Sequence, residues 1–290
     1  MTILLADAGS TKTDWVCLTE NQCIACIDGS FSGPGISPVH NDSESICNIL
    51  MQARDAIGHS FDHIRFFGTG VGSPELKMKI EECVASVFNC PDIKADSDMA
   101  AAARAVLGNS PGIACIMGTG SNSCHYNGSA IDRKSASLGF ILDDDGGGVA
   151  FGKRLLADIF KNVAPGKIIE LFHSSYRLST PDVVRHIYRE PSPNRWIAGF
   201  MPFIVDHIEN PYIANLVDSQ IERFISREFA IYPDSELTDE GVGFVGSVAC
   251  LFEDRIRKAF YDRGWKVRNF TPKPLEELIR NEMNSPGAII

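Results

Sequence analysis

The chain has 290 residues, more than a typical single domain of roughly 100–200 residues, which predicts two lobes. Its 27 basic and 37 acidic residues give a formal net charge of −10, which disfavours non-specific binding to nucleic acid because the phosphates would be repelled. No window approaches the ~20 apolar residues of a membrane span, and no signal-peptide pattern opens the chain. We therefore expect a cytoplasmic protein with neither a membrane nor a nucleic acid as partner.

The first predicted element is a strand, a tight turn and a second strand between Ile3 and Leu18. The first apolar run ends in Asp7, and the turn is rich in Gly, Ser and Thr, so its backbone N–H groups can converge on an anion. Asp7 could hold a hydrated Mg²⁺ above that anion, and a lysine adds a positive charge. The alternative is an ordinary β-hairpin with a polar turn. The turn residues are Gly9, Ser10, Thr11 and Lys12.

Strands and helices alternate through the rest of the first lobe. The helices have apolar residues at helical spacing, and the strands are short apolar runs that end in turn residues. The glycine-rich segment Gly68–Gly72, which includes Gly70, follows one of these strands. In chain order we predict a strand at Cys23–Asp28, a loop at Ser30–Asn41, a helix at Ser43–Ile57, a strand at Ile64–Phe67, a helix from Pro74, a strand at Asp92–Ala95 and a helix at Met99–Leu107.

Nine cysteines, an odd number, lie mostly in apolar runs, which favours reduced and buried thiols. Cys23 and Cys26 form a CxxC pair. Residues i and i+3 of a strand point to opposite faces, so this pair favours an ordinary strand over a metal or redox site.

Asp98 follows a predicted strand and opens a predicted helix. It could act as a general base that accepts the proton of a substrate hydroxyl as this oxygen attacks phosphorus. The alternative is a helix N-cap, a position that Asp favours. Asp96 and Ser97 are further candidates for the same cap.

A break at Gly108–Gly112 predicts the lobe boundary, and a second strand, turn and strand follow it. The strands Ile113–Met117 and Cys124–Tyr126 flank another Gly/Thr/Ser turn, so the second lobe repeats the opening pattern. This turn can present amides and hydroxyls to phosphate oxygens, and Asn122 could bond a ligand, whereas the alternative is a plain glycine-rich hairpin. The turn residues are Gly118, Thr119, Gly120 and Ser121.

Three carboxylates precede three glycines at Asp143–Gly148. Asp144 and Asp145 could bind metal or sugar hydroxyls, or could stabilise the N-terminus of the next helix through its dipole. Adjacent carboxylates repel one another, so at least one of them needs a partner.

The region 165–233 is predicted to be mostly helical, and a strand is predicted at Val242–Val245. The next helix runs to Phe260, and its first residues could contact a nucleotide through their backbone. We expect a strand at Lys266–Asn269 and a final helix at Pro274–Met283 that packs back onto the first lobe. The helix begins with Gly246, Ser247 and Val248.

These stretches together resemble the actin/hexokinase/Hsp70 ATPase superfamily, and within it the N-acetylglucosamine kinases and the BadF/BadG/BcrA/BcrD-type ATPases. The resemblance implies an α/β fold of two ribonuclease-H-like lobes, residues 1–108 and 109–273, with residues 274–290 packing on the first lobe and ATP in the cleft between the lobes. The matching stretches are Asp7–Asp14, Asp98–Ala101, Gly118–Asn122, Asp144–Gly146 and Val245–Val248.

The resemblance also implies roles for single residues. Asp7 would lie near Mg²⁺, the two turns would surround the phosphates of ATP, and Gly246–Val248 would lie near the adenosine. Asp98 would be the base for the 6-hydroxyl of a sugar. The residues expected to line the sugar pocket are Ser37, Gly70, Thr119, Asn122 and Asp144.

The chain departs from the amino-sugar kinases in several places. Ser37 stands where they often have Asn, Leu138 stands where they often have Trp, and a glycine replaces a hydroxyl residue within Asp143–Gly148. A glycine-rich element near their C-terminus is missing or altered here. These differences affect the predicted identity of the sugar more than the predicted binding of ATP.

We therefore expect an ATP-dependent kinase that uses Mg²⁺ and phosphorylates the 6-hydroxyl of an amino sugar such as N-acetylglucosamine or glucosamine, and that could form a homodimer. One alternative is an activator ATPase that acts on a partner protein and holds an iron–sulfur cluster between two subunits, but Cys115 and Cys124 do not form a convincing cluster pair. Another alternative is a non-catalytic sugar sensor. The sequence leaves the acceptor sugar, the oligomeric state and the pathway open.

Overall fold

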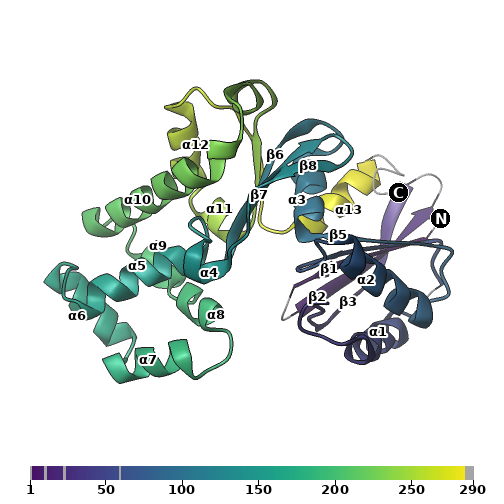
Figure 1. Cartoon of the computed structure of the whole chain (residues 1–290), viewed down its shortest axis with the longest axis horizontal. Helices are drawn as coiled ribbons and strands as arrows, with labels where there is room; N and C mark the ends of the chain where they lie inside the picture. Colours follow the sequence, from purple (N-terminus) through teal and green to yellow (C-terminus); the bar gives the residue numbers. More distant parts are fainter. Residues whose placement is uncertain (1, 10–11, 22–23, 59, 285–290) are drawn as a thin grey trace. The chain divides into compact units, whose positions relative to one another are not determined.

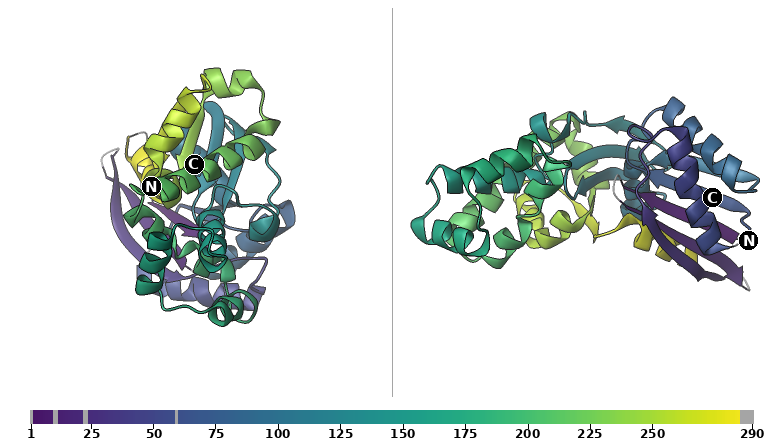
Figure 2. Two further views of the ribbon diagram at one scale, coloured as in Figure 1. Left: turned by 90° about the vertical axis from the view of Figure 1, so that its left-hand side faces the viewer. Right: turned by 90° about the horizontal axis from the view of Figure 1, so that it is seen from below.

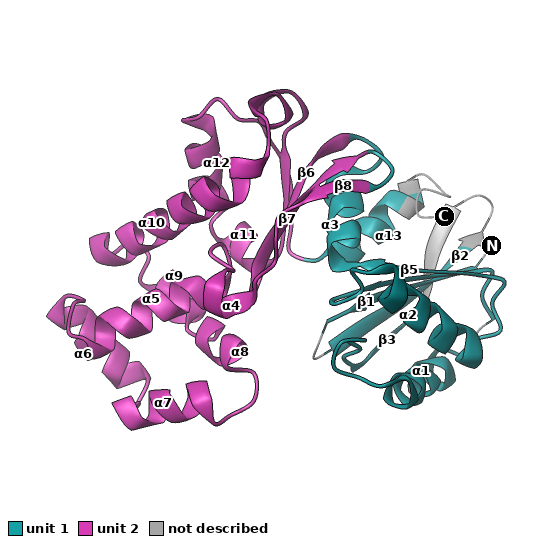
Figure 3. Cartoon of the chain, in the orientation of Figure 1, with its two compact units in different colours: residues 1–110, 128–130, 273–290 teal, residues 111–127, 131–272 magenta. Residues whose placement is uncertain are grey.

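The computed structural model describes residues 2–9, 12–21, 24–58 and 60–284, and the chain divides into two compact units (Figure 3). Unit 1 comprises Met1–Ser110, Gly128–Ala130 and Lys273–Ile290, and unit 2 comprises Pro111–Asn127 and Ile131–Pro272. Within the described residues, no helix is long and apolar enough to cross a membrane.

Unit 1 is built on a five-stranded sheet with the order β3-β2-β1-β4-β5 (Figure 1). The pairs β1–β2 and β2–β3 are antiparallel, whereas β1–β4 and β4–β5 are parallel. The central strand β1 is buried along Ile3–Ala6, as expected for a strand covered on both faces. The strands are β1 (Thr2–Ala8), β2 (Lys12–Asn21), β3 (Ile24–Pro34), β4 (His63–Gly68) and β5 (Asp92–Ser97).

Helices cover both faces of this sheet (Figure 1). Side chains alternate along a strand, so Leu4 and Ala6 of β1 pack with α1 and α2, whereas Ile3 and Leu5 pack with α3 and α13. The helix α1 begins after Asp42, whose side chain accepts a hydrogen bond from the Ser45 N–H group. The helices are α1 (Ser43–Ile57), α2 (Pro74–Val87), α3 (Asp98–Leu107) and α13 (Pro274–Asn284).

Unit 2 repeats the same strand pattern in the order β10-β9-β6-β7-β8. The pairs β6–β7 and β7–β8 are antiparallel, and β6–β9 and β9–β10 are parallel. Each unit therefore carries three antiparallel strands followed by two strands parallel to the first. The structure thus confirms the repeat expected from the two hairpin sequences. The strands are β6 (Pro111–Met117), β7 (Ser121–Asn127), β8 (Ile131–Lys134), β9 (Val242–Val245) and β10 (Val267–Thr271).

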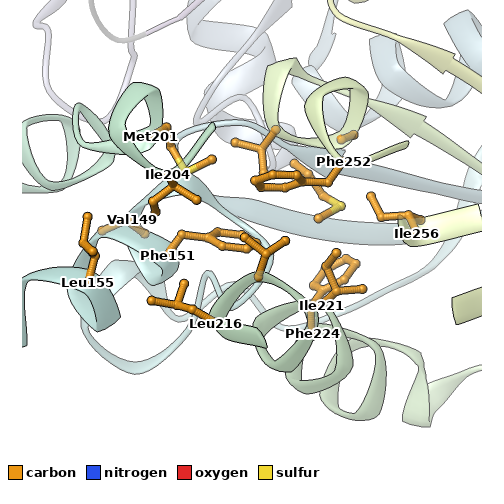
Figure 4. Close-up of a cluster of buried hydrophobic side chains, with 14 of the residues drawn as sticks. Val149, Phe151, Leu155, Met201, Ile204, Leu216, Ile221, Phe224, Phe252 and Ile256 are labelled. Atoms are coloured by element: carbon orange, nitrogen blue, oxygen red, sulfur yellow. The ribbon is translucent and has the colours of Figure 1, made fainter. Parts of the chain in front are cut away.

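The helices α5 to α10 of unit 2 lie to one side of its sheet in Figure 1 and in the right-hand view of Figure 2. Buried side chains from α5, α9, α10 and α12 point toward one another in the core between them (Figure 4), where the rings of Phe151 and Phe252 lie 5.3 Å apart. The helices are α4 (Gly139–Leu142), α5 (Gly148–Phe160), α6 (Gly166–Ser175), α7 (Thr180–Tyr188), α8 (Pro193–Ala198), α9 (Met201–Asp206), α10 (Pro211–Glu228), η1 (Phe229–Ile231), η2 (Glu236–Glu240), α11 (Ser247–Leu251) and α12 (Glu253–Tyr261).

The structure corrects two of the predicted elements and adds a strand that was not predicted. The predicted loop Ser30–Asn41 was wrong at its start, because residues 30–34 belong to β3 and pair with residues 12–16 of β2. The helix predicted from Gly246 to Phe260 is two helices, α11 and α12, because the backbone leaves the helical region at the buried residue Phe252. The strand β8 was not predicted; it forms by pairing with β7.

Candidate functional site

In unit 1 the site is positioned by the carboxyl ends of three parallel strands. Ala8 at the end of β1 is in register with Gly68 at the end of β4, and Gly68 is in register with Ser97 at the end of β5. Asp7, the Gly68–Gly72 segment and Asp98 therefore gather at one edge of the sheet. Ligands of open α/β sheets commonly bind at this edge.

Asp98 is the first residue of α3, and its carboxylate is held by two donors. Its Oδ1 accepts a hydrogen bond from the Met99 N–H group at 2.9 Å, and its Oδ2 accepts one from the Thr69 hydroxyl at 2.9 Å. Ser97 is the N-cap, because its hydroxyl accepts the Ala100 N–H group at 3.2 Å. The alternative interpretation of Asp98 as the helix cap is therefore wrong, and its carboxylate retains acceptor capacity for a substrate.

The carboxyl group of Asp7 is partly buried at the end of β1, close to other acidic groups. Burial and, to a smaller extent, the negative charges of Asp98 and Asp14 raise its pKa to about 6, against an opposing effect of Lys273. A cation beside Asp7 would relieve this repulsion. Among the described residues no three metal-ligating side chains converge, so a cation here would rely on one or two carboxylates with water and phosphate oxygens, which is how Mg²⁺ usually binds.

The first turn is described only at its two ends, because Ser10 and Thr11 lie outside the described residues. The Gly9 N–H group donates to the Lys12 carbonyl at 2.9 Å and closes the turn. The Lys12 ammonium lies 2.7 Å from Asp14 Oδ1, and the Lys12 side chain is 59% exposed. Its positive charge is therefore shared with Asp14, whose pKa is raised by burial but ends below its ordinary value because Lys12 and Ser32 stabilise the carboxylate.

Two of the residues predicted to bind sugar lie next to each other in unit 1. Ser37 is buried, and its N–H group donates to Asn41 Oδ1 at 2.9 Å. Gly70 has a φ of +84°, and a Cβ atom there would lie 3.4 Å from Ser37 Oγ and 3.0 Å from Val39 Cγ2. The left-handed backbone and the close loop explain why a glycine stands here.

In unit 2 the second turn rests on the N-terminus of α5. The Gly148 N–H group donates to the Gly118 carbonyl at 2.8 Å, and the Val149 N–H group donates to the Thr119 carbonyl at 3.0 Å. These bonds satisfy two donors of a helix that has no side-chain cap. The carbonyls on this side of the turn are thus occupied, while the Thr119 side chain is exposed.

Asp144 stabilises the second turn through a hydrogen bond of its side chain, in addition to the bonds from α5. Its Oδ1 accepts the Ser121 N–H group at 2.8 Å, and the Ser121 hydroxyl accepts the Gly146 N–H group at 2.9 Å. Asp144 is a non-glycine residue with a φ of +66°, in the left-handed region. Burial raises its pKa, and the charge of Asp143 adds to this although the Ser121 N–H group opposes it. Its role in binding a sugar stays a prediction.

Asp145 has the partner that the run of three carboxylates requires. Its Oδ1 accepts a hydrogen bond from Arg223 Nε at 2.9 Å, and Arg227 Nε forms an ion pair with Oδ2 at 2.9 Å. Both arginines come from consecutive turns of α10. Lys153 of α5 also lies near the carboxylates, and burial lowers its pKa while Asp145 and Asp144 oppose this. The buried Asp145 is therefore a structural carboxylate.

We expect Asp144→Asn and Asp144→Ala to differ in stability. Asn tolerates the left-handed backbone and keeps an oxygen for the Ser121 N–H group, whereas Ala is strained there and leaves that donor unpaired. Asp144→Ala should lower the free energy of unfolding by about 2–4 kcal/mol, and Asp144→Asn by less than about 1 kcal/mol. Urea unfolding measures both; equal stability of the two variants would contradict the stabilising role of Asp144.

The remaining residues predicted to bind ligand also lie in unit 2. Asn122 Oδ1 accepts the Ser123 N–H group at 2.7 Å, and Gly246 has a φ of +119° where a Cβ atom would lie 2.3 Å from the Met117 carbonyl oxygen. Gly246 therefore allows the start of α11 to approach the end of β6. Ser247 is exposed, whereas the Val248 side chain is buried in the core.

The cysteines relevant to the cluster-binding alternative are Cys115 and Cys124 of the second hairpin and the CxxC pair, of which Cys26 lies in β3. Cys115 and Cys124 are fully buried on neighbouring strands, and burial raises the pKa of the Cys115 thiol, with Glu228 and Cys124 adding to the effect. A thiolate ligand is disfavoured in such a place. Cys23 of the CxxC pair lies outside the described residues.

The sequence interpretation missed several polar residues of the site. Thr69 lies within the glycine-rich segment noted after β4, so its position was visible, but its contact with Asp98 depends on the register of β4 and β5. Lys273, in the C-terminal segment of unit 1, lowers the pKa of Asp7 although it is more than 250 residues away in sequence. The only feature of the sequence that could have marked Arg223 and Arg227 is their spacing of four residues, which places them on the same face of a helix.

The comparisons with known proteins agree with this architecture. No protein-family model and no curated protein matches the chain. Among solved structures it is similar to a putative N-acetylglucosamine kinase from Porphyromonas gingivalis, with 35% identity over 98% of this chain and 99% of that one and a TM-score of 0.89. A putative N-acetylglucosamine kinase from Chromobacterium violaceum has 15% identity over 97% of this chain and 98% of that one, with a TM-score of 0.72.

A non-polymerising MamK mutant bound to AMPPNP has 11% identity over 98% of each chain and a TM-score of 0.55. At these low identities the second and third likenesses show the fold alone. Together with the two repeated sheets they establish the fold as that of the actin-like ATPases, as the opening motifs indicated.

Proposed function

The chain belongs to the same family as the putative N-acetylglucosamine kinase of Porphyromonas gingivalis, and from this premise we propose that it is an ATP-dependent sugar kinase. The proposed reaction is transfer of a phosphoryl group to the 6-hydroxyl of an amino sugar such as N-acetylglucosamine or glucosamine. The names of the relatives support the sugar class, and the residues of the site support the reaction type.

The observation that carries this proposal is the position of the Asp98 carboxylate and the hydrogen bonds that hold it. A carboxylate that is not needed as a helix cap is held by Thr69 and by the Met99 N–H group at the carboxyl edge of three parallel strands. It lies close enough to Asp7 to raise the pKa of that group. A fixed carboxylate beside a candidate cation site is what a kinase needs to orient and deprotonate an acceptor hydroxyl.

We assign the other residues as follows. Asp7 would hold Mg²⁺ through water, the backbone of Gly9–Lys12 and of Gly118–Ser121 would bind phosphate oxygens, and Gly246–Val248 would contact the adenosine. ATP supplies the phosphoryl group and Mg²⁺ neutralises phosphate charge when both are bound. Asp98 accepts the proton of the sugar hydroxyl. The proposed sugar contacts are Ser37, Gly70, Thr119, Asn122 and Asp144.

The test is direct phosphorylation of sugars by the purified full-length chain. It is incubated with ATP, Mg²⁺ and a panel of hexoses, hexosamines and N-acetylhexosamines, and the products are resolved by ³¹P NMR, which separates a 6-phosphate from a 1-phosphate. We expect a 6-phosphate with at least one amino sugar. Calorimetry on the same panel adds a second arm: tight sugar binding without any phosphorylated product would instead identify a sensor.

Two further expectations stay predictions. A homodimer would be seen by sedimentation at several protein concentrations. A cytoplasmic location would be seen by fractionation of cells that express the chain.

A further inference from the structure

We propose that Thr69 is a positioning residue for Asp98 and fixes the direction from which this carboxylate meets the acceptor hydroxyl. The inference rests on the proposed function, because it assigns Thr69 a role through the proposed base. It is carried by the contacts of Thr69 with the end of β1 and with Asp98 at the start of α3.

Thr69 is held at both its backbone and its side chain. Its N–H group donates to the Ala8 carbonyl at 2.9 Å, which ties it to the end of β1 next to Asp7. Its hydroxyl donates to Asp98 Oδ2 at 2.9 Å, across the pair β4–β5. The backbone of Thr69 is therefore fixed by one strand while its hydroxyl fixes a side chain that follows another.

The two donors on Asp98 act on different oxygens. The Met99 N–H group binds Oδ1 and the Thr69 hydroxyl binds Oδ2, so the plane of the carboxylate is defined by both. With the Met99 bond alone the carboxylate could turn about χ2, a torsion that is broad for Asp. An ionised carboxylate only accepts hydrogen bonds, so Thr69 must donate here, and its β-branched side chain restricts χ1 and with it the hydroxyl.

The position of Thr69 also connects the base with the predicted sugar contacts. The next residue is Gly70, whose backbone lies in the left-handed region beside Ser37. A shift of this segment would move the proposed base and the proposed sugar contacts against each other. A displacement of this kind affects the chemical step more than binding, because the attacking oxygen must be aligned.

The test replaces the hydroxyl with a methyl group of similar size. We expect Thr69→Val to lower kcat for sugar phosphorylation by about 10- to 100-fold, the range for loss of a hydrogen bond to a charged group. The KM values for sugar and ATP should change by less than about threefold. Thr69→Ser, which keeps the donor, should recover kcat to within about fivefold of the unsubstituted chain.

The double variant separates this inference from the proposed function. If Thr69 acts through Asp98, Thr69→Val should have no further effect on kcat in an Asp98→Asn background, since coupled residues are not additive.

Thr238→Val, a substitution at an exposed threonine of unit 2, is the matched control and should leave kcat unchanged. Melting curves of every variant show whether it is folded, and Thr69→Ala replaces Thr69→Val if the valine does not fold.

The outcomes are distinct. A Thr69→Val enzyme with normal kcat beside an inactive Asp98→Asn enzyme would overturn the positioning role and leave the proposed function intact. Multiplicative losses in the double variant would also overturn it. A normal kcat in Asp98→Asn would show that Asp98 is not the base, and it would contradict the proposed mechanism.

Discussion

Asp98→Asn is expected to lower kcat for sugar phosphorylation by about 100- to 10,000-fold, the usual contribution of a general base. Asn has the same shape, its oxygen can accept the Met99 N–H group, and its amide can donate to the Thr69 hydroxyl, which can rotate to accept it. The side chain therefore stays in place but cannot take up a proton. The KM for ATP should remain within about threefold, because the change affects the chemical step.

The matched control is Asp96→Asn, two residues earlier. Asp96 forms an ion pair with Lys77 at 2.7 Å, and we expect its substitution to change kcat by only a few-fold. A direct physical readout accompanies the kinetics: removal of the Asp98 charge should lower the raised pKa of Asp7, which ¹³C NMR of its carboxyl group can follow. An unchanged kcat in Asp98→Asn, with the Asp7 pKa lowered as expected, would contradict the base assignment alone.

Asp7→Asn is expected to have opposite effects on stability and on activity. The folded state raises the pKa of Asp7 from 3.8 to about 6, so ionised Asp7 destabilises the fold. The penalty develops as the pH rises from about 4 to about 6 and is complete above that. Without Mg²⁺ at pH 8, Asp7→Asn should therefore raise the free energy of unfolding by about 1–3 kcal/mol and the melting temperature by several degrees.

The gain in stability should vanish at pH 3.5, where Asp7 is protonated in the folded protein and largely so in the unfolded chain. Melting curves across this pH range in the presence of a chelator measure it. Asp55→Asn, an exposed acidic residue of α1 paired with Arg54, is the control and should change the stability by less than about 0.5 kcal/mol. A lower melting temperature for Asp7→Asn at pH 8 would show that the electrostatic account of this residue is wrong.

The same variant should respond only weakly to Mg²⁺ and ATP. In the unsubstituted chain a bound ligand raises the melting temperature by mass action, and for Mg·ATP this rise should fall as the pH drops through about 6, where Asp7 becomes protonated. Asp7→Asn should show a small rise at every pH, and a kcat at least about 100-fold lower. If Mg·ATP raised the melting temperature of Asp7→Asn as much as that of the unsubstituted chain, Asp7 would not be part of the cation site.

Much of the fold could be predicted from local sequence. The apolar runs before Asp7 and before Gly118 predicted the two hairpins, and helical spacing of apolar residues predicted α1 and α2. The position of Asp7 at a strand end was visible in the same way. Each of these predictions depends only on residues that are close to one another in the sequence.

Other parts depend on partners that are far away in sequence. The polar end of β3 forms a strand because β2 pairs with it, although its residues alone favour a loop. Asp145 is buried because Arg223 and Arg227 approach it from a helix about 80 residues later. No local pattern around Asp145 contains that information.

Asp98 shows the same division within a single residue. The sequence alone determined that a carboxylate follows a strand at the start of a helix, and with the two turns it indicated a kinase of the actin-like ATPase fold. It could not decide between a base and a cap, because Asp96, Ser97 and Asp98 could each cap the helix. The tertiary structure decided which residue caps the helix, because the Ser97 hydroxyl reaches the Ala100 N–H group, while the register of β4 and β5 places Thr69 beside Asp98. The role of Asp98 as a base stays a prediction.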